Sequence, residues 1–280
     1  MFRFPHGGAS GDLLRRERRA SDLLRPLLPL PIPHYDFHSE GCALFEQPVG
    51  GYRKLDGVPL QDCTLGEPTL RQVAVELGSF LTALHRVPLD VVQAAGLPSF
   101  TPTQMQDMQS AFYAEVQQHA FPLLGTGERE WTQALFEPFL ADTANWRFEP
   151  ALVHGDFDAS NILCDPAQGK VIGVIDFEEA CMGDPAWDFC VLAAEYGSSF
   201  LQKLLAVYRL PLDDRFVDRV TFHARRILFH ELLYGIQENA QLFLDHGLVR
   251  LRRAMMGLEP IGGWLAASTS GPRSIEGIPD

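Results

Sequence analysis

Three polar side chains between residues 152 and 189 have the types and the spacing to carry out a reaction around a metal ion. Asp156 follows an apolar pair and a glycine, Asn161 lies five residues later, and Asp176 ends a β-branched run. A carboxylate can accept or orient a proton, and carboxylate and amide oxygens are ligands that Mg²⁺ prefers. Residues of these types could therefore accept a proton and hold a hard cation such as Mg²⁺.

The segment between Asn161 and Asp176 has the pattern of a β-hairpin. Apolar strands are expected at residues 162–164 and 171–175, with a turn that contains proline and glycine between them. Such a hairpin would carry Asp176 back to the end at which Asn161 begins, so that both oxygens could share one cation. A single Asp could equally cap a turn or a helix, but the joint pattern argues against coincidence.

The sequence before residue 60 and the sequence after it differ in the secondary structure that they predict. The first part predicts a strand, a helix over Leu13–Leu27 and short strands near residues 35–38, 43–46 and 49–55. The second part predicts long helices outside the hairpin. We therefore expect an α+β chain of two lobes, a sheet lobe over residues 1–56 and a mostly helical lobe over residues 57–266. Residues 267–280 are rich in Ser, Gly and Pro and predict a disordered tail.

The helices of the second lobe follow from apolar residues at helical spacing. They are predicted over residues 68–86, 101–120, 130–140, 185–196 and 200–210. A long helix over residues 213–245 is expected to be interrupted or re-phased near Gly235, and a last helix covers residues 248–256.

Composition and charge narrow the range of partners. Of the 280 residues 46% are hydrophobic, enough for a sizeable core, and the net charge of −13 disfavours a nucleic-acid partner. The same charge would suit a cationic small molecule, although an acidic surface is also common in soluble proteins. Five cysteines without Cys-x-x-Cys spacing suggest free thiols in a reducing compartment. With no apolar run of membrane-spanning length, we expect a soluble, cytoplasmic protein.

The wider pattern resembles a known family. Five motifs carry the resemblance, namely His154-Gly155-Asp156, Asn161, Ile175-Asp176-Phe177, Gly183-Asp184-Pro185 and Asp188. Together they are similar to the signature of the aminoglycoside phosphotransferase and choline kinase group, which is related to the protein kinases. Residues 51–60 and 77–85 also look like the hinge and the following helix of 2''-aminoglycoside phosphotransferases. The resemblance implies a two-lobed, protein-kinase-like fold. It also implies Mg²⁺-dependent transfer of the γ-phosphate of ATP or GTP to a hydroxyl of a small molecule, as in antibiotic resistance.

The resemblance assigns roles to the residues of the motif. Asp156 would be the catalytic base, and Asn161 and Asp176 would hold Mg²⁺. Three further residues would support the loop, namely His154 as a brace, Asp188 through hydrogen bonds to the backbone, and Asp184 as the cap of the following helix.

Near the start of the chain the resemblance implies a nucleotide site. Arg3 stands where the family's phosphate-binding Lys or Arg lies, and Glu17 stands where a helix glutamate pairs with it. An exposed basic residue is the alternative interpretation of Arg3. Main-chain groups of the hinge would bind the purine, at the residues Tyr52, Arg53, Lys54 and Leu55, and the side chain of Lys54 is expected in solvent.

The implied acceptor is hydroxylated and amine-bearing, because aminoglycosides are polycations. Four acids and one aromatic residue would face it, namely Glu179, Glu195, Glu231, Glu238 and Trp264. Glu231 and Glu238 are seven residues apart on one helix and so project to the same side. Each of the five could instead be a solvated acid or a packing aromatic residue. The family also phosphorylates choline, homoserine, methylthioribose and macrolides, so a metabolic kinase acting on choline, homoserine or a sugar stays an alternative.

One departure from the family concerns the start of the chain. The family has two strands and a glycine-bearing loop before the Phe-Arg-Phe-Pro strand, which here occupies residues 2–5. That missing segment would cover the nucleotide phosphates. We expect either a truncated or misassigned start or a weakened hold on the nucleotide, so an inactive nucleotide-binding protein is the second alternative.

Overall fold

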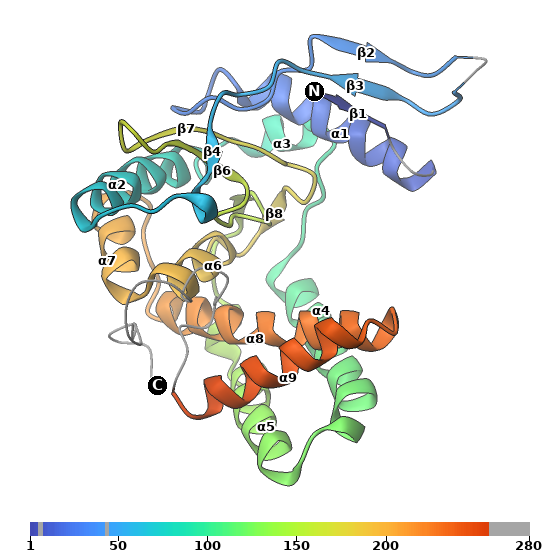
Figure 1. Ribbon diagram of the computed structural model, residues 1–280, viewed down its shortest axis with the longest axis vertical. Coiled ribbons are helices and arrows are strands. Elements are labelled where there is room, and N and C mark those ends of the chain that lie inside the picture. Colours follow the sequence, from blue (N-terminus) through green and yellow to red (C-terminus); the bar gives the residue numbers. More distant parts are fainter. Residues whose placement is uncertain (5–7, 43–44, 258–280) are drawn as a thin grey trace. The chain divides into compact units, whose positions relative to one another are not determined.

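The computed structural model describes residues 1–4, 8–42 and 45–257 (Figure 1), and over these ranges the chain is α+β, as predicted. The strands are β1 Phe2–Arg3, β2 Phe37–Ser39, β3 Val49–Gly51, β4 Val58–Pro59, β5 Ala151–Val153, β6 Ile162–Asp165, β7 Lys170–Val174 and β8 Cys181–Gly183. The helices are α1 Gly8–Leu24, α2 Glu67–Leu84, α3 Leu89–Ala95, α4 Pro102–Glu115, α5 Thr126–Ala141, α6 Trp187–Tyr196, α7 Ser198–Val207, α8 Phe216–Gln237 and α9 Gln241–Met255.

The chain divides into two compact units, neither of which is continuous in sequence. Unit 1 comprises residues 1–99, 151–188 and 203–210, and unit 2 comprises residues 100–150, 189–202 and 211–280. The two-lobe boundary near residue 56 follows a different criterion, the change in predicted secondary structure, and stays a prediction. The predicted tail over residues 267–280 lies outside the described residues.

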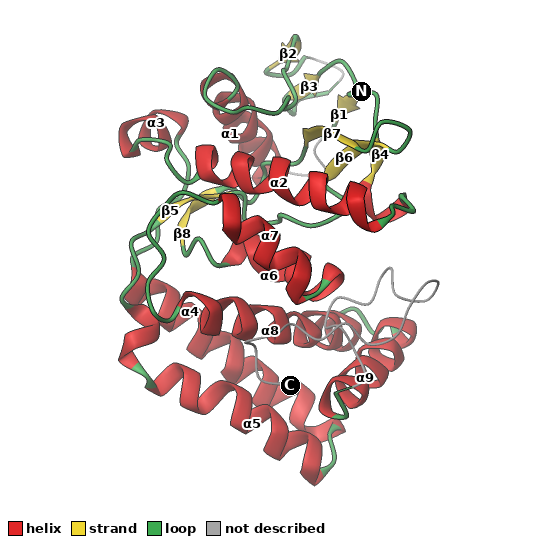
Figure 2. Ribbon diagram, turned by 90° about the vertical axis from the view of Figure 1, so that its left-hand side faces the viewer, coloured by secondary structure: helices red, strands yellow, loops and turns green. Residues whose placement is uncertain are grey.

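Unit 1 contains small antiparallel sheets. The first has the strand order β1-β3-β2, and these strands lie side by side in Figure 1. The second has the order β4-β6-β7 and includes the predicted hairpin, in which Ile162 lies opposite Val174. Helix α2 lies against β7 (Figure 2). Finally β5 pairs with β8, so that Val153, the residue before the proposed catalytic loop, lies opposite Cys181.

The break between α8 and α9 differs from the sequence-based expectation. Residue 235 does not interrupt the helix, since α8 runs to Gln237 and α9 then covers the rest of the predicted long helix together with most of the last one. The break lies at Asn239, whose φ is +51°, a left-handed conformation that Asn adopts more readily than most residues. Gly235 instead permits close packing, because a Cβ atom there would lie 2.5 Å from the main-chain nitrogen of Leu244.

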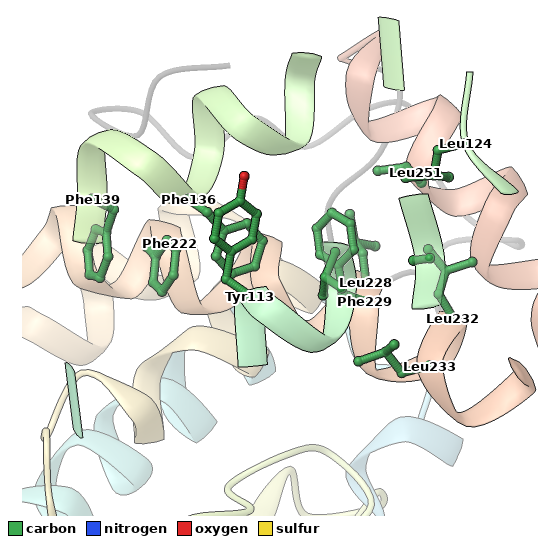
Figure 3. Packing of buried hydrophobic residues seen from close by; sticks show 12 residues of the cluster. Tyr113, Leu124, Phe136, Phe139, Phe222, Leu228, Phe229, Leu232, Leu233 and Leu251 are labelled. Carbon is green, nitrogen blue, oxygen red and sulfur yellow. The ribbon is translucent and has the colours of Figure 1, made fainter. Parts of the chain in front are cut away.

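Unit 2 is held together by an aromatic core shared by α4, α5 and α8 (Figure 3). The rings of Phe139 and Phe222 stack with 3.6 Å between centroids, and Phe136 stacks on Tyr113 at 4.7 Å. Offset-stacked aromatic pairs with the separation of Phe136 and Tyr113 add to the free energy gained from burial. Among the described residues, no helix is long and apolar enough to cross a membrane.

Candidate active site

The loop between β5 and β6 contains a glycine at a point of close approach. Gly155 has a φ of +84°, and a Cβ atom there would lie 2.4 Å from the main-chain oxygen of Glu179. Only glycine adopts this conformation without strain and leaves room for the neighbouring backbone. The loop that presents Asp156 therefore lies directly against the segment that follows Asp176.

Asp188 is the buried anchor of this loop. Its side chain is fully buried, and it accepts hydrogen bonds from the main-chain N–H groups of His154 (2.8 Å) and Gly155 (3.0 Å). His85, just after α2, contacts the same carboxylate through Nε2 at 3.0 Å, and its Nδ1 lies 2.8 Å from the hydroxyl of Tyr208. One carboxylate thus fixes the start of the loop to the end of α2.

His154 joins the loop to the strand that leads to Asp176. Its Nδ1 accepts the main-chain N–H of Asp156 at 3.3 Å, and its Nε2 lies 2.9 Å from the main-chain oxygen of Ile175. This pair of contacts requires the tautomer with a proton on Nε2, since a carbonyl can only accept. Asp184 has a separate local role, because it accepts the N–H of Ala186 at 3.0 Å just before α6.

Asp156 and Asn161 are in direct contact. The side-chain amide of Asn161 donates to the main-chain oxygen and to the carboxylate Oδ2 of Asp156, both at 2.9 Å. Its amide protons are used in this way, so its side-chain oxygen is the group left to meet a cation. Asp158 shapes the turn between them by accepting the N–H groups of Ser160 (2.8 Å) and Asn161 (3.2 Å).

The donor set beside Asn161 fits a magnesium ion. The N–H of Ile175, the residue after β7, donates to the main-chain oxygen of Asn161, the residue before β6, at 2.9 Å. Asp176 is the next residue along the chain, so it follows directly on the residue that is bonded to Asn161. Both side chains offer hard oxygens, which suits Mg²⁺. The described part of the chain contains no cluster of three or more His, Cys, Asp and Glu that could hold a metal alone. A cation here would complete its shell with phosphate oxygens and water, as Mg²⁺ usually does.

The pKa of Asp156 gives a pH-dependent prediction. Desolvation of its carboxylate and, next, the charge of Asp158 raise its pKa above the ordinary value. The folded protein therefore favours the protonated form more than the unfolded chain does, and stability is lost as pH rises through the raised pKa. The asparagine in Asp156→Asn cannot titrate. We therefore expect the free energy of unfolding of this variant to increase relative to that of the wild type as pH rises.

Urea unfolding of the ligand-free protein and the variant, between about pH 4 and pH 7, measures this difference. The gain should begin near the ordinary Asp pKa and become constant above the raised one. A difference that is independent of pH, or that shrinks as pH rises, would show that the carboxylate is not destabilised by its surroundings.

Arg3 and Glu17 form an ion pair close to Asp176. The Nη1 atom of Arg3 donates to Oε2 of Glu17 at 2.5 Å and lies 3.6 Å from Oδ1 of Asp176. Glu17 also accepts the hydroxyl of Tyr35 at 2.8 Å. Burial alone would lower the pKa of Arg3, but Glu17, Tyr35 and Asp176 outweigh it and raise that pKa above its ordinary value. A permanent cation is therefore held beside a predicted metal ligand.

A cavity lies at the predicted hinge. It has a volume of about 540 Å³ and is lined by Met1, Phe2, Asp36, Phe37, Tyr52, Arg53 and Lys54. The main-chain N–H of Tyr52 donates to the oxygen of Met1 at 3.0 Å, and its carbonyl accepts from the amino group of Met1 at 2.7 Å. The main-chain groups of Tyr52 are thus paired with Met1, while Arg53 and Lys54 line the same cavity. Binding by the hinge, including Leu55, stays a prediction.

Comparison with known proteins places this arrangement in a family. The phosphotransferase enzyme family matches residues 1–218. The chain belongs to this family. Viomycin phosphotransferase of Streptomyces vinaceus is 27% identical over 206 residues, which cover 72% of this chain and 69% of that protein. The resemblance predicted from the sequence motifs is thereby confirmed.

Solved structures share the phosphotransferase fold. The GDP complex of wild-type aminoglycoside 2'-phosphotransferase-IIIa has 26% identity and a TM-score of 0.80, covering 90% of this chain and 84% of that one. The GDP and kanamycin complex of APH(2")-IIia has 25% identity and a TM-score of 0.82, over 91% and 86% of the two chains. Macrolide 2'-phosphotransferase type I, at 21% identity and a TM-score of 0.73 over 89% and 82%, shares the fold alone. The predicted protein-kinase-like fold is confirmed.

The predicted substrate residues of this phosphotransferase lie in different surroundings. Glu179 belongs to unit 1 and is exposed, whereas Glu195 on α6 belongs to unit 2 and is 8% exposed. Glu238 follows the last residue of α8 and is exposed. Trp264 lies outside the described residues. Contact of these side chains with an acceptor stays a prediction.

Glu231 on α8 is already paired within unit 2. Its Oε2 accepts from Nη1 of Arg250 at 2.8 Å, and its Oε1 lies 2.5 Å from Nδ1 of His246. Both partners are on α9. To bind a substrate amine, Glu231 would have to exchange or share these contacts, which lowers the free energy that such binding could gain.

Three residues that contact the predicted site residues or shape their loop are not among those that the sequence motifs predict. They are His85, Asp158 and Glu178, of which Glu178 accepts Nη2 of Arg3 at 2.8 Å. Asp158 had a local signal, since an Asp two residues before a Ser commonly caps a turn. His85 and Glu178 make contacts across 103 and 175 residues, so spacing along the chain does not predict their partners, although His85 ends a segment that resembles the family.

Proposed function

We propose that this chain transfers the γ-phosphate of ATP or GTP, with Mg²⁺, to a hydroxyl of a small amine-bearing molecule. The observation that supports this is the gathering, within unit 1, of a proton acceptor, two oxygen donors and a paired cation. These are Asp156, Asn161 with Asp176, and Arg3. Phosphoryl transfer depends on such positioning and neutralisation of charge more than on covalent chemistry by the protein.

Under this proposal each side chain has one task. Asp156 accepts or orients the proton of the acceptor hydroxyl, and its contact with Asn161 fixes the carboxylate. Asn161 and Asp176 hold Mg²⁺, which when bound neutralises charge on the phosphates. Arg3, kept in place by Glu17, meets phosphate oxygens with its planar fork of N–H groups.

An aminoglycoside is the acceptor that we propose. The chain's relatives include a viomycin phosphotransferase and an aminoglycoside phosphotransferase solved with GDP and kanamycin. The net charge of −13 also favours an amine-bearing molecule over an anionic one. A cytoplasmic location, where nucleoside triphosphates are made, belongs to the same proposal and agrees with the free cysteines of the described residues.

A substrate panel tests the function. The full chain is incubated with ATP or GTP, with Mg²⁺ or EDTA, and with kanamycin, viomycin, a macrolide, choline or homoserine, and the release of ADP or GDP is measured. We expect Mg²⁺-dependent release with kanamycin. Release with choline or homoserine alone would indicate a metabolic kinase. Nucleotide binding without release for any acceptor would indicate an inactive protein, and neither binding nor release would reject the proposal.

Removing one predicted metal ligand tests the magnesium site directly. We expect Asp176→Asn to raise the Kd of ADP at least about tenfold in the presence of Mg²⁺ and to change it little in EDTA. Isothermal titration calorimetry measures both values. Asp165→Asn, at the far end of the same hairpin, is the matched control and should bind as the wild type does. Equal losses with and without Mg²⁺ would mean that Asp176 does not act through a cation.

A further inference from the structure

Arg3 contacts three carboxylates, one of which has no task in the proposed reaction. Its Nη1 atom lies 2.5 Å from Glu17 Oε2 and 3.6 Å from Asp176 Oδ1. Its Nη2 atom donates to Oε2 of Glu178 at 2.8 Å. Glu178 comes two residues after Asp176 and is not itself among the predicted metal ligands. All four residues belong to unit 1.

The partners of Arg3 differ in their access to solvent. The side chain of Glu17 is 1% exposed, whereas the side chains of Arg3 and Glu178 are each 28% exposed. The Asp176 side chain is 42% exposed, so solutes can reach Arg3 from the side of Glu178 and Asp176 but not from the side of Glu17. The guanidinium offers a planar fork of N–H donors that binds carboxylate and phosphate with the same geometry. Glu178 thus occupies the part of the fork that an arriving phosphate would use.

We propose that Glu178 is a positioning residue that holds the Arg3 fork in the absence of nucleotide and yields it to a nucleotide phosphate. This inference rests on the proposed function. An arriving phosphate must displace the Glu178 carboxylate, so part of the binding free energy is spent on breaking that contact. Glu178 therefore keeps Arg3 extended towards the site while it lowers the affinity for nucleotide.

The backbone of Glu178 can stay in place during the exchange. Its main-chain oxygen accepts Nη2 of Arg16, on α1, at 3.1 Å. Only the side chain has to rotate, so the exchange need not disturb Asp176 two residues earlier.

Glu178→Gln tests the inference through binding rather than turnover. We expect the Kd of ADP or GDP, measured calorimetrically with Mg²⁺, to fall about two- to fivefold, because the neutral amide competes less well for Arg3. Glu40→Gln is the matched control, since it neutralises a comparable Arg–Glu contact, 2.6 Å from Arg15, elsewhere in unit 1. The Kd of that variant should equal the wild-type value.

Repeating the Glu178→Gln change in an Arg3→Lys protein distinguishes an effect on the Arg3 guanidinium from an effect of net charge. In Arg3→Lys, where the planar fork is absent, adding Glu178→Gln should no longer lower the Kd. A gain that persists in the lysine background would reflect net charge and overturn the inference. So would an unchanged or higher Kd for Glu178→Gln alone, with the proposed function intact. If the wild type binds neither ADP nor GDP, the inference and the proposed function both fail.

Discussion

Asp156→Asn is expected to slow phosphoryl transfer about 100- to 10,000-fold, the range typical of losing a general base. The asparagine keeps the size of the side chain but cannot accept the hydroxyl proton. Its effect should lie in kcat, because Asp156 contacts Asn161 and the loop backbone rather than the hinge cavity. Steady-state kinetics with the best acceptor of the panel measures the loss.

Nucleotide binding provides the internal control for this variant. The Kd of ADP with Mg²⁺ should change less than about tenfold, since the predicted metal ligands are retained. Asp107→Asn makes the same chemical change at an exposed position of α4 and should leave kcat unaltered. A fully active Asp156→Asn protein would rule out proton transfer by this residue, whatever the fold.

The second large effect concerns stability. We expect Asp188→Ala to reduce the free energy of unfolding by roughly 3–5 kcal/mol, because it leaves the N–H groups of His154 and Gly155 and the ring of His85 without their buried acceptor. Urea unfolding followed by circular dichroism measures the change. Because unit 1 holds all of these contacts, the loss should appear in the transition of that unit.

Two further variants calibrate that loss. Asp188→Asn keeps one acceptor oxygen and should cost less than the alanine variant. Asp218→Asn, which weakens a surface pair with Arg215, should change the free energy of unfolding by less than about 1 kcal/mol. If Asp188→Ala were as stable as the wild type, the loop would have to be fixed by other contacts, and His154 with Ile175 would be the first to examine.

The parts of the site that the sequence predicted are those built from local contacts. The hairpin between Asn161 and Asp176 follows from two short apolar runs and a turn, and the structure pairs these runs as the antiparallel strands β6 and β7. The contacts of Asp188 with His85 and of Arg3 with Glu178 join segments far apart in the chain, so no spacing rule predicts them. The helix break at Asn239 was placed four residues too early because glycine weakens a helix in general but here permits tight packing.

The turn of the β6–β7 hairpin lies away from the end that carries Asn161 and Asp176, so its length can change without moving those two residues. Pro166, Ala167 and Gln168 are exposed at its turn, while Gly169 is buried against Thr69. Because the two strands run back along each other, residues added at the exposed tip lengthen a loop without changing the register that brings Asn161 beside Ile175. Evolution or an engineer can therefore insert an epitope or a reporter between two predicted ligands of one metal ion and leave their spacing in three dimensions as it was.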